Sequence, residues 1–388
     1  MTKLIYLDNA ATAFPKPNRV IDYMADFYRS HGVNPGRSGY DLSVEAGLII
    51  DEARRSLDAF FNNPAHDFNR LTFGLNASDA LNMIIHGIPQ KGDHVISTTL
   101  EHNSVLRPLY VLEQDGYLEH ELVPFDGDGY IDPDEIRRRI RSNTSLVIIN
   151  HGSNVLGTIQ PVAEVGRICR ENGVCFAIDA AQTAGMVPID MEAMCIDILA
   201  FTGHKSLLGP TGIGGLAVGP DVPIRSTRWG GTGVRSAVRT HLDDFPFRTE
   251  VGTLNTVGVA GLLAAQKYLA EHDLSRIRAH EMALTGRLLE GFAEIPNILT
   301  YCAGADERHL PVVSCNIEDW EAGEVGMFLD AEYDIATRTG LHCAPLVHDG
   351  IGTTPKGSVR FSVGPFNTES DIEAAITAMR EIAALRQR

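Results

Sequence analysis

Two stretches, Ile178-Asp179-Ala180-Ala181-Gln182 and Phe201-Thr202-Gly203-His204-Lys205-Ser206, indicate both the fold and the chemistry of this chain. Each begins where an apolar run ends and continues with polar side chains. Because ligands of doubly wound sheets collect at the carboxyl ends of the strands, we expect Asp179 and Lys205 to lie close together. An aspartate there can hold a protonated pyridine nitrogen, and a lysine there can form a Schiff base. A lone aspartate would more often cap a helix and a lone lysine would be solvated, but the paired placement favours a cofactor site.

Outward from these stretches, short apolar runs alternate with helical segments. The runs are His94–Ser97, Leu146–Ile149, Val174–Ile178 and Ile196–Phe201, and Val162–Asn172 has a helical pattern between them. Continuous apolar strands separated by helices are typical of a parallel sheet that is buried on both faces. The sequence therefore predicts an α/β fold with a mostly parallel sheet.

Two helices are predicted before this region. Ser43 precedes an amphipathic pattern that reaches Phe61, so we expect Ser43 to be a helix cap. Asn76 precedes a helix that opens on small residues and ends at Gly87.

The pattern changes near Val257, where a long helical stretch begins and runs through Arg287. After it we expect alternating strands and helices at Val312–Ile317, Glu324–Leu329, Val359–Val363 and from Thr368 onward. This mixture suits a small α+β domain. We therefore divide the chain into a segment at the domain seam (1–20), a large domain (21–256) and a small C-terminal domain (257–388).

Composition excludes several classes of partner. The chain has 388 residues, 44% of them hydrophobic, and a formal net charge of −17. This charge repels nucleic acid and anionic lipid, so neither is expected as a partner. No apolar run approaches the ~18 residues that a membrane span needs, and the first residues lack a signal-peptide pattern. We expect a cytoplasmic protein.

Two patterns mimic metal sites. The stretch Pro124–Glu135 has the acidic spacing of half an EF-hand loop, but Glu121–Phe125 reads as a strand and not as an entering helix. We interpret it as a solvated turn that caps the helix at Asp134–Ile140. The histidines at 102, 151, 204 and 342 show no paired ligand spacing, so no metal is predicted.

Six segments carry a family resemblance. They are Tyr6-Leu7-Asp8-Asn9-Ala10-Ala11-Thr12, Asn150-His151-Gly152-Ser153-Asn154-Val155-Leu156-Gly157, Asp179-Ala180-Ala181-Gln182, Thr202-Gly203-His204-Lys205, Arg248-Thr249-Glu250-Val251-Gly252-Thr253-Leu254-Asn255 and Arg338-Thr339-Gly340-Leu341-His342-Cys343-Ala344. In this order they resemble the class V aminotransferase family of fold-type I pyridoxal-phosphate enzymes. The last resembles the R-x-G-x-H-C-A stretch of group II cysteine desulfurases and selenocysteine lyases. The resemblance covers nearly the whole chain. It implies a fold-type I transferase, with a mostly parallel sheet of the seven-stranded type in the large domain and a smaller α+β C-terminal domain.

The resemblance implies a role for each matching residue. Lys205 would carry pyridoxal 5'-phosphate and later move the Cα proton, while Asp179 pairs with the ring nitrogen. The other cofactor contacts would come from Asn76, Ala77, Ser78, His102, Asn154, Gln182, Thr202, His204 and, from a second subunit, Thr253. His102 would stack on the ring and is assigned to the catalytic set; its alternative is an ordinary loop histidine. Asn154 and Arg360 would hold the substrate carboxylate, although Arg360 could instead be a surface residue of an edge strand.

Cys343 is implied as the catalytic nucleophile. The other five cysteines sit in apolar runs and read as core residues, whereas Cys343 lies in a loop pattern where His342 and Arg338 could favour its thiolate. The implied reaction is conversion of L-cysteine to L-alanine, with sulfur held on Cys343 as a persulfide. Three alternatives stay open: a selenocysteine lyase, an aminotransferase or β-lyase in which Cys343 is not essential, and a non-enzymatic scaffold.

Partners follow from the same resemblance. Thr253 implies a homodimer, and the persulfide implies a sulfur-acceptor protein. The 16 residues between Cys343 and Arg360 form a short tether, so we expect the thiol to stay near the pocket mouth and the acceptor to dock beside Leu341–Asp349.

The phosphate loop departs from the family pattern, which often has threonines where this chain has Gly74–Asp79. The glycine-rich stretch His31–Tyr40 is expected to line the mouth of a site.

Overall fold

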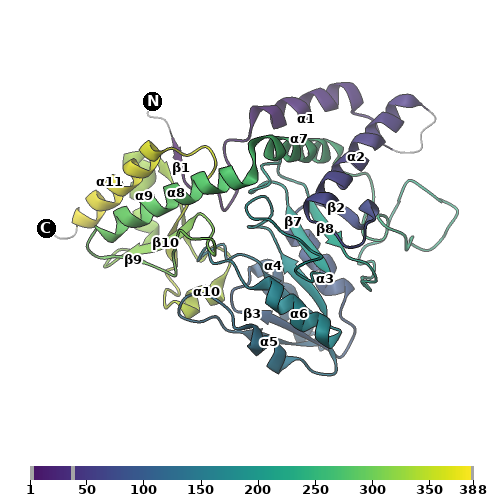
Figure 1. The fold of residues 1–388 in the computed structure, drawn as a ribbon, viewed down its shortest axis with the longest axis horizontal. Coiled ribbons are helices and arrows are strands. Elements are labelled where there is room, and N and C mark those ends of the chain that lie inside the picture. The colour runs from purple at the N-terminus through teal and green to yellow at the C-terminus, as the bar shows by residue number, and fades with distance from the viewer. Residues whose placement is uncertain (1–3, 36–39, 386–388) are drawn as a thin grey trace.

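A seven-stranded sheet forms the centre of the computed structural model, which describes residues 4–35 and 40–385 (Figure 1). Its strand order is β2-β8-β7-β6-β5-β3-β4. All neighbours run parallel except at β8, which is antiparallel to both β2 and β7. The strands are β2 (Leu71–Gly74), β3 (Asp93–Thr98), β4 (Leu118–Val123), β5 (Thr144–Asn150), β6 (Cys175–Asp179), β7 (Ile198–Thr202) and β8 (Gly214–Val218). The predicted α/β fold with a mostly parallel sheet is confirmed.

Helices cover both faces of this sheet. Alternate strand residues such as Val95 and Ile148 pack under α3 (Ala77–Gly87) and α4 (Asn103–Gln114). Their neighbours point to the opposite face, which is covered by α2 (Asp41–Phe60), α5 (Pro133–Arg139), α6 (Val162–Asn172) and α7 (Thr256–His272). Burial on both faces explains why these strands read as continuous apolar runs.

A second, four-stranded sheet lies in the C-terminal part, with the order β12-β13-β10-β9 and antiparallel pairing throughout. Its elements are β9 (Ile298–Thr300), β10 (Val312–Ile317), β12 (Arg338–Gly340) and β13 (Ser358–Ser362). It packs in a separate apolar core with α8 (Leu274–Ala293), α9 (Ala322–Tyr333) and α11 (Glu369–Leu385). A short helix, α10 (Pro345–Gly350), follows β12.

The N-terminal segment contacts both parts. β1 (Ile5–Tyr6) pairs with β11 (Ile335–Ala336) in the C-terminal part. A few residues later, the backbone N–H of Ala13 donates to the carbonyl of His204 beside the large sheet. The segment then continues into α1 (Asn18–His31), which packs against α7.

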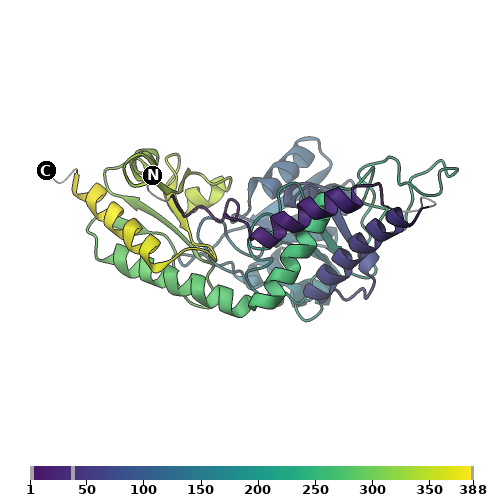
Figure 2. The ribbon, with the colours of Figure 1, turned by 90° about the horizontal axis from the view of Figure 1, so that it is seen from above.

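The long helical stretch consists of two helices that meet at Asp273, whose φ of 60° breaks the helix. Figure 2 shows the two green helices running along both halves of the molecule. Because α7 packs against α1 and α2 in the core of the large sheet, we propose that the domains divide near Asp273 rather than at residues 256/257.

Local capping was predicted with mixed success. Asn76 caps α3 as expected, since its side chain accepts from the backbone N–H of Asp79. The prediction for Ser43 was wrong: α2 begins at Asp41, and the buried Ser43 hydroxyl donates to the carbonyl of Asn34. The EF-hand mimic is a turn, in which Asp126 accepts from the N–H groups of Asp128 and Tyr130. Residues 36–39 of the glycine-rich stretch lie outside the described part.

Candidate active site

Asp179 and Lys205 meet at the carboxyl edge of the large sheet, as predicted. Asp179 is the last residue of β6, and Lys205 follows the end of the adjacent strand β7 by three residues. Both line one cavity of about 260 Å³ that lies between the two halves of the chain. The cavity brings together every predicted site residue except Thr253.

The protein environment alters the charge of both groups. Burial raises the pKa of Asp179, opposed by a hydrogen bond from the Ala181 N–H at 2.8 Å and by the nearby Lys205. Burial lowers the pKa of Lys205 to about 8, with Asp179 acting in the opposite direction. A neutral amine is therefore far more accessible at Lys205 than at a solvated lysine.

One end of the cavity is suited to an anion. The first residues of α3, Ala77 and Ser78, line it and offer the free N–H groups of a helix start. Thr202 and His204 line the same cavity, and Thr202 Oγ1 and His204 Nδ1 are buried and have no hydrogen-bond partner among the described residues. Buried polar atoms without partners are costly, so these two atoms fit a bound phosphate group.

The N-terminal segment forms a wall of the cavity. The carbonyl of His204, directly before Lys205, accepts from the Ala13 N–H, from Thr12 Oγ1 at 3.1 Å and from Lys16 Nζ at 2.5 Å. Gln182 Nε2 donates to the carbonyl of Ala10 at 3.0 Å. These bonds fix the backbone that presents the lysine.

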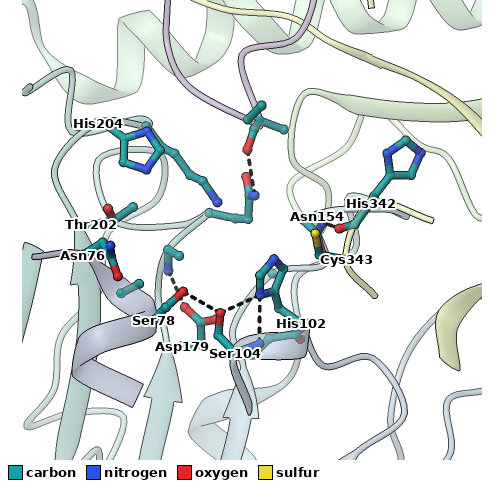
Figure 3. Close-up of a pocket in the computed structure, with 18 of the residues that line it drawn as sticks. Asn76, Ser78, His102, Ser104, Asn154, Asp179, Thr202, His204, His342 and Cys343 are labelled. Carbon is teal, nitrogen blue, oxygen red and sulfur yellow. Dashed lines mark hydrogen bonds between the residues drawn. The ribbon is translucent and has the colours of Figure 1, made fainter. Parts of the chain in front are cut away.

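His102 stands at the start of α4 and lines the same cavity (Figure 3). Its Nδ1 accepts the backbone N–H of Ser104 at 3.1 Å, so the imidazole is the helix cap. Burial, assisted by the positive charge of Lys205, lowers the pKa of His102 to about 4. The ring is therefore neutral near pH 7.

Cys343 lies exposed on a tight turn at the cavity wall. His342 and Cys343 both have positive φ, 48° and 59°, a conformation that costs non-glycine residues about 1 kcal/mol or more each. Hydrogen bonds hold this turn, from Asn154 Nδ2 to the carbonyl of His342 at 2.7 Å and from the Asn103 N–H to that of Cys343 at 2.7 Å. The turn is thus fastened to the start of α4 and to the loop that follows β5.

The expected help from His342 is not available. Its ring is buried, contacts Ser358, and in Figure 3 points away from Cys343. Burial lowers the pKa of His342 to about 2, so the ring carries no charge that could stabilise a thiolate. Arg338 does line the cavity. Cys175 and Cys302, which were assigned to the core, are only half-buried, but both pack against an apolar core of the large sheet.

Arg360 lies inside the protein and not on its surface. It sits on β13 between two other strands, and only 2% of it is exposed. Its guanidinium donates to Asp8 Oδ1 at 2.7 Å and to the carbonyl of Asn154 at 3.0 Å. Asp8 and Ser104 are the site features that the sequence did not single out. Each is recognisable only once distant segments are brought together.

Thr253 is exposed and lines a neighbouring cavity with Gly74 and Leu75, outside the lining of the Lys205 cavity.

Within residues 4–35 and 40–385, no group of three or more histidine, cysteine or acidic side chains is arranged to hold a metal. No helix in that part of the chain combines the length and apolarity of a membrane span.

Comparisons with known proteins agree with this geometry. The family model described as aminotransferase class-V matches residues 5–375. A probable cysteine desulfurase of Methanothermobacter thermautotrophicus is 34% identical, over 98% of this chain and 95% of that protein. The cysteine desulfurase of Thermococcus onnurineus, solved in its apo form, superposes with a TM-score of 0.89 at 31% identity, covering 98% of this chain and 95% of that one. A cysteine desulfurase of Escherichia coli superposes with a TM-score of 0.86 at 27% identity over the same shares of the two chains. This chain belongs to the class-V aminotransferase family.

Proposed function

We propose that this protein is a pyridoxal-phosphate-dependent cysteine desulfurase, which converts L-cysteine to L-alanine and holds the sulfur on Cys343. The observation that carries the proposal is that Lys205 and the exposed thiol of Cys343 line one cavity with Arg360. An amine, a nucleophilic sulfur and a guanidinium are the three groups that this reaction requires of the protein. The names of the similar proteins support the same activity.

The residues that would hold the cofactor follow from the site. Lys205 would bond its aldehyde carbon, Asp179 its ring nitrogen and Gln182 its ring oxygen, with His102 against the ring. Its phosphate would take the helix start at Asn76, Ala77 and Ser78 and the side chains of Thr202 and His204. When bound, pyridoxal phosphate withdraws electrons from the substrate Cα and makes its proton acidic.

Lys205 would then move this proton. With a pKa lowered from 10.5 to about 8, its amine is a base much closer to neutral pH than a solvated lysine, and this favours general base catalysis. Its segment is held by the three donors on the His204 carbonyl, so the amine stays directed into the cavity.

Cys343 would act in the sulfur transfer. Its thiolate attacks the substrate sulfur, a sulfur–sulfur bond forms, and the bond between sulfur and the substrate Cβ breaks. The electron pair stays on the substrate carbon, which takes up protons and leaves as alanine. Cys343 retains a persulfide, and the one difficult step is divided into two.

Arg360 and Asn154 would receive the substrate carboxylate. Arg360 is already paired with Asp8, so the incoming carboxylate competes with Asp8 for the guanidinium. Exchange of one carboxylate for another keeps the buried charge neutralised throughout.

We further propose a homodimer in which Thr253 of one subunit contacts the phosphate bound by the other subunit. The exposure of Thr253 in a single chain supports this.

The turn at Cys343 is fastened to Asn103 and Asn154. A fixed turn suits delivery of the persulfide sulfur to an acceptor protein that brings its own thiol to Leu341–Asp349. The free thiols of all six cysteines suit a reducing compartment such as the cytoplasm.

The test is alanine formation from L-cysteine by purified, cofactor-loaded protein and by Cys343→Ser. We expect the wild type to form alanine and the variant to lose this activity. Cys302→Ser, which alters a half-buried thiol that does not line the cavity, is the matched control and should remain active. Full activity of Cys343→Ser with cysteine would contradict the proposal and favour a β-lyase. Activity of the wild type with selenocysteine but not with cysteine would favour a selenocysteine lyase.

A further inference from the structure

Two hydroxyl groups connect the anion end of the cavity to His102. Ser78 Oγ, on the first turn of α3, lies 2.6 Å from Ser104 Oγ. Ser104 Oγ in turn lies 2.8 Å from Nδ1 of His102. The chain of contacts is visible in Figure 3, where dashed lines run from Ser78 through Ser104 to the imidazole.

The tautomer of His102 follows from one of these contacts. The backbone N–H of Ser104 can only donate, and it points at Nδ1 from 3.1 Å. Nδ1 must therefore be the unprotonated nitrogen. Since the ring is neutral near pH 7, its single proton is on Nε2.

The two hydroxyl protons can be arranged in two ways. With no anion at α3, Ser78 donates to Ser104, and Ser104 donates to Nδ1. With an anion at the helix start, the Ser78 proton turns to the negative charge, because charge-assisted hydrogen bonds are the stronger ones. Ser104 is then the only donor left for the Ser78–Ser104 contact, and if it donates to Ser78 to keep that contact, Nδ1 loses its hydroxyl donor.

The Ser78–Ser104 contact is not needed to cap α4, as the cap of another helix shows. Ser275, at the same position of α8, bonds its N-cap residue in the same way: its N–H and its hydroxyl donate to Asp273 Oδ1 at 3.0 and 2.7 Å. Within the described residues Ser275 makes no hydroxyl contact like the one that links Ser104 to Ser78. The feature particular to Ser104 is thus its link to the anion site.

We propose that Ser104 is a positioning residue that couples occupancy of the anion site at α3 to the hydrogen bonding of His102. The proposal rests on the proposed function in assigning the phosphate and His102 to one cofactor. Binding of the phosphate removes one of two donors from Nδ1 and leaves the Nε2 proton directed away from Ser104. The proton affinity of the imidazole is then higher with the anion site filled than with it empty.

The test uses the full chain freed of its cofactor, labelled with ¹⁵N-histidine, and inorganic phosphate as the probe. The Nδ1 signal of His102 is assigned by its loss in His102→Gln. We expect this signal to have the position of an unprotonated nitrogen and to move when phosphate is added. In Ser104→Ala the movement should be lost, while the backbone signals of Ala77 and Ser78 still report phosphate binding.

Two further variants separate coupling from damage to the helix. Ser104→Thr keeps the hydroxyl and should restore the movement, and Ser275→Ala, which removes the equivalent hydroxyl of α8, should behave as the wild type. Equal movement of Nδ1 in Ser104→Ala and wild type would overturn the proposal, because phosphate would then act on the ring by its charge alone. An unresponsive Nδ1 in the wild type overturns it as well. No L-cysteine is added as substrate, so the result is independent of the proposed desulfurase activity.

Discussion

Replacing Asp8 by asparagine would test how the substrate-binding end of the site is stabilised. The change keeps the size of the side chain and removes its charge, which leaves Arg360 as a buried cation with 2% exposure. Removing one partner of a buried ion pair lowers the free energy of unfolding by about 3–5 kcal/mol, because the other charge stays buried and unpaired. Because Asp8 itself is 19% exposed, we expect the lower end, about 3 kcal/mol, and a fall of roughly 5 °C in the unfolding midpoint.

The assay is thermal unfolding of the cofactor-loaded protein, with and without L-alanine. The carboxylate of L-alanine can replace the missing charge, so it should stabilise Asp8→Asn more than the wild type. Glu373→Gln is the control, because Glu373 pairs with Arg287 through two hydrogen bonds on the surface, where both side chains are at least 40% exposed. That change should cost less than about 1 kcal/mol. The reasoning is refuted if both variants unfold at the same temperature and respond equally to L-alanine.

Three other predictions concern the cofactor. Borohydride should fix it to a peptide containing Lys205, and mass spectrometry should find no such adduct in Lys205→Ala. Because the pKa of Lys205 is lowered from 10.5 to about 8, its neutral amine becomes available as pH rises through about 8. Uptake of cofactor by the cofactor-free chain, followed by absorbance, should therefore accelerate from about pH 7 and level off above about pH 9; a rise only near pH 10.5 would contradict this. Thr253→Ala should lose cofactor faster on dialysis, and sedimentation should show a dimer; an active monomer would exclude the shared site.

Local patterns predicted the centre of the site because each part is encoded within a few residues. Asp179 and Lys205 each follow their own apolar strand, and adjacent parallel strands then bring them together. The cap at Asn76 is equally local, since its partner is three residues away. Ser43 shows the limit of this approach. Serine is a common helix-capping residue, but α2 begins two residues before Ser43, at Asp41, so Ser43 lies inside the first turn of the helix.

The remaining features depend on contacts between distant segments. Asp8 and Arg360 are separated by 352 residues, and no local pattern indicates that they neutralise each other. The contact between Ser78 and Ser104 joins the starts of two helices and was equally invisible in the sequence. His342 has a side chain that can carry the charge expected beside Cys343, but burial keeps its ring neutral.

The central claim is that the sulfur of cysteine passes to Cys343. The most direct measurement is mass spectrometry of the cofactor-loaded protein after reaction with one equivalent of L-cysteine, in the absence of any reductant. We predict one additional sulfur atom on the peptide containing Cys343, one alanine released per chain, and renewed turnover when a thiol reductant is added. Alanine formation with no sulfur on Cys343, or sulfur found equally on Cys302, would contradict the account.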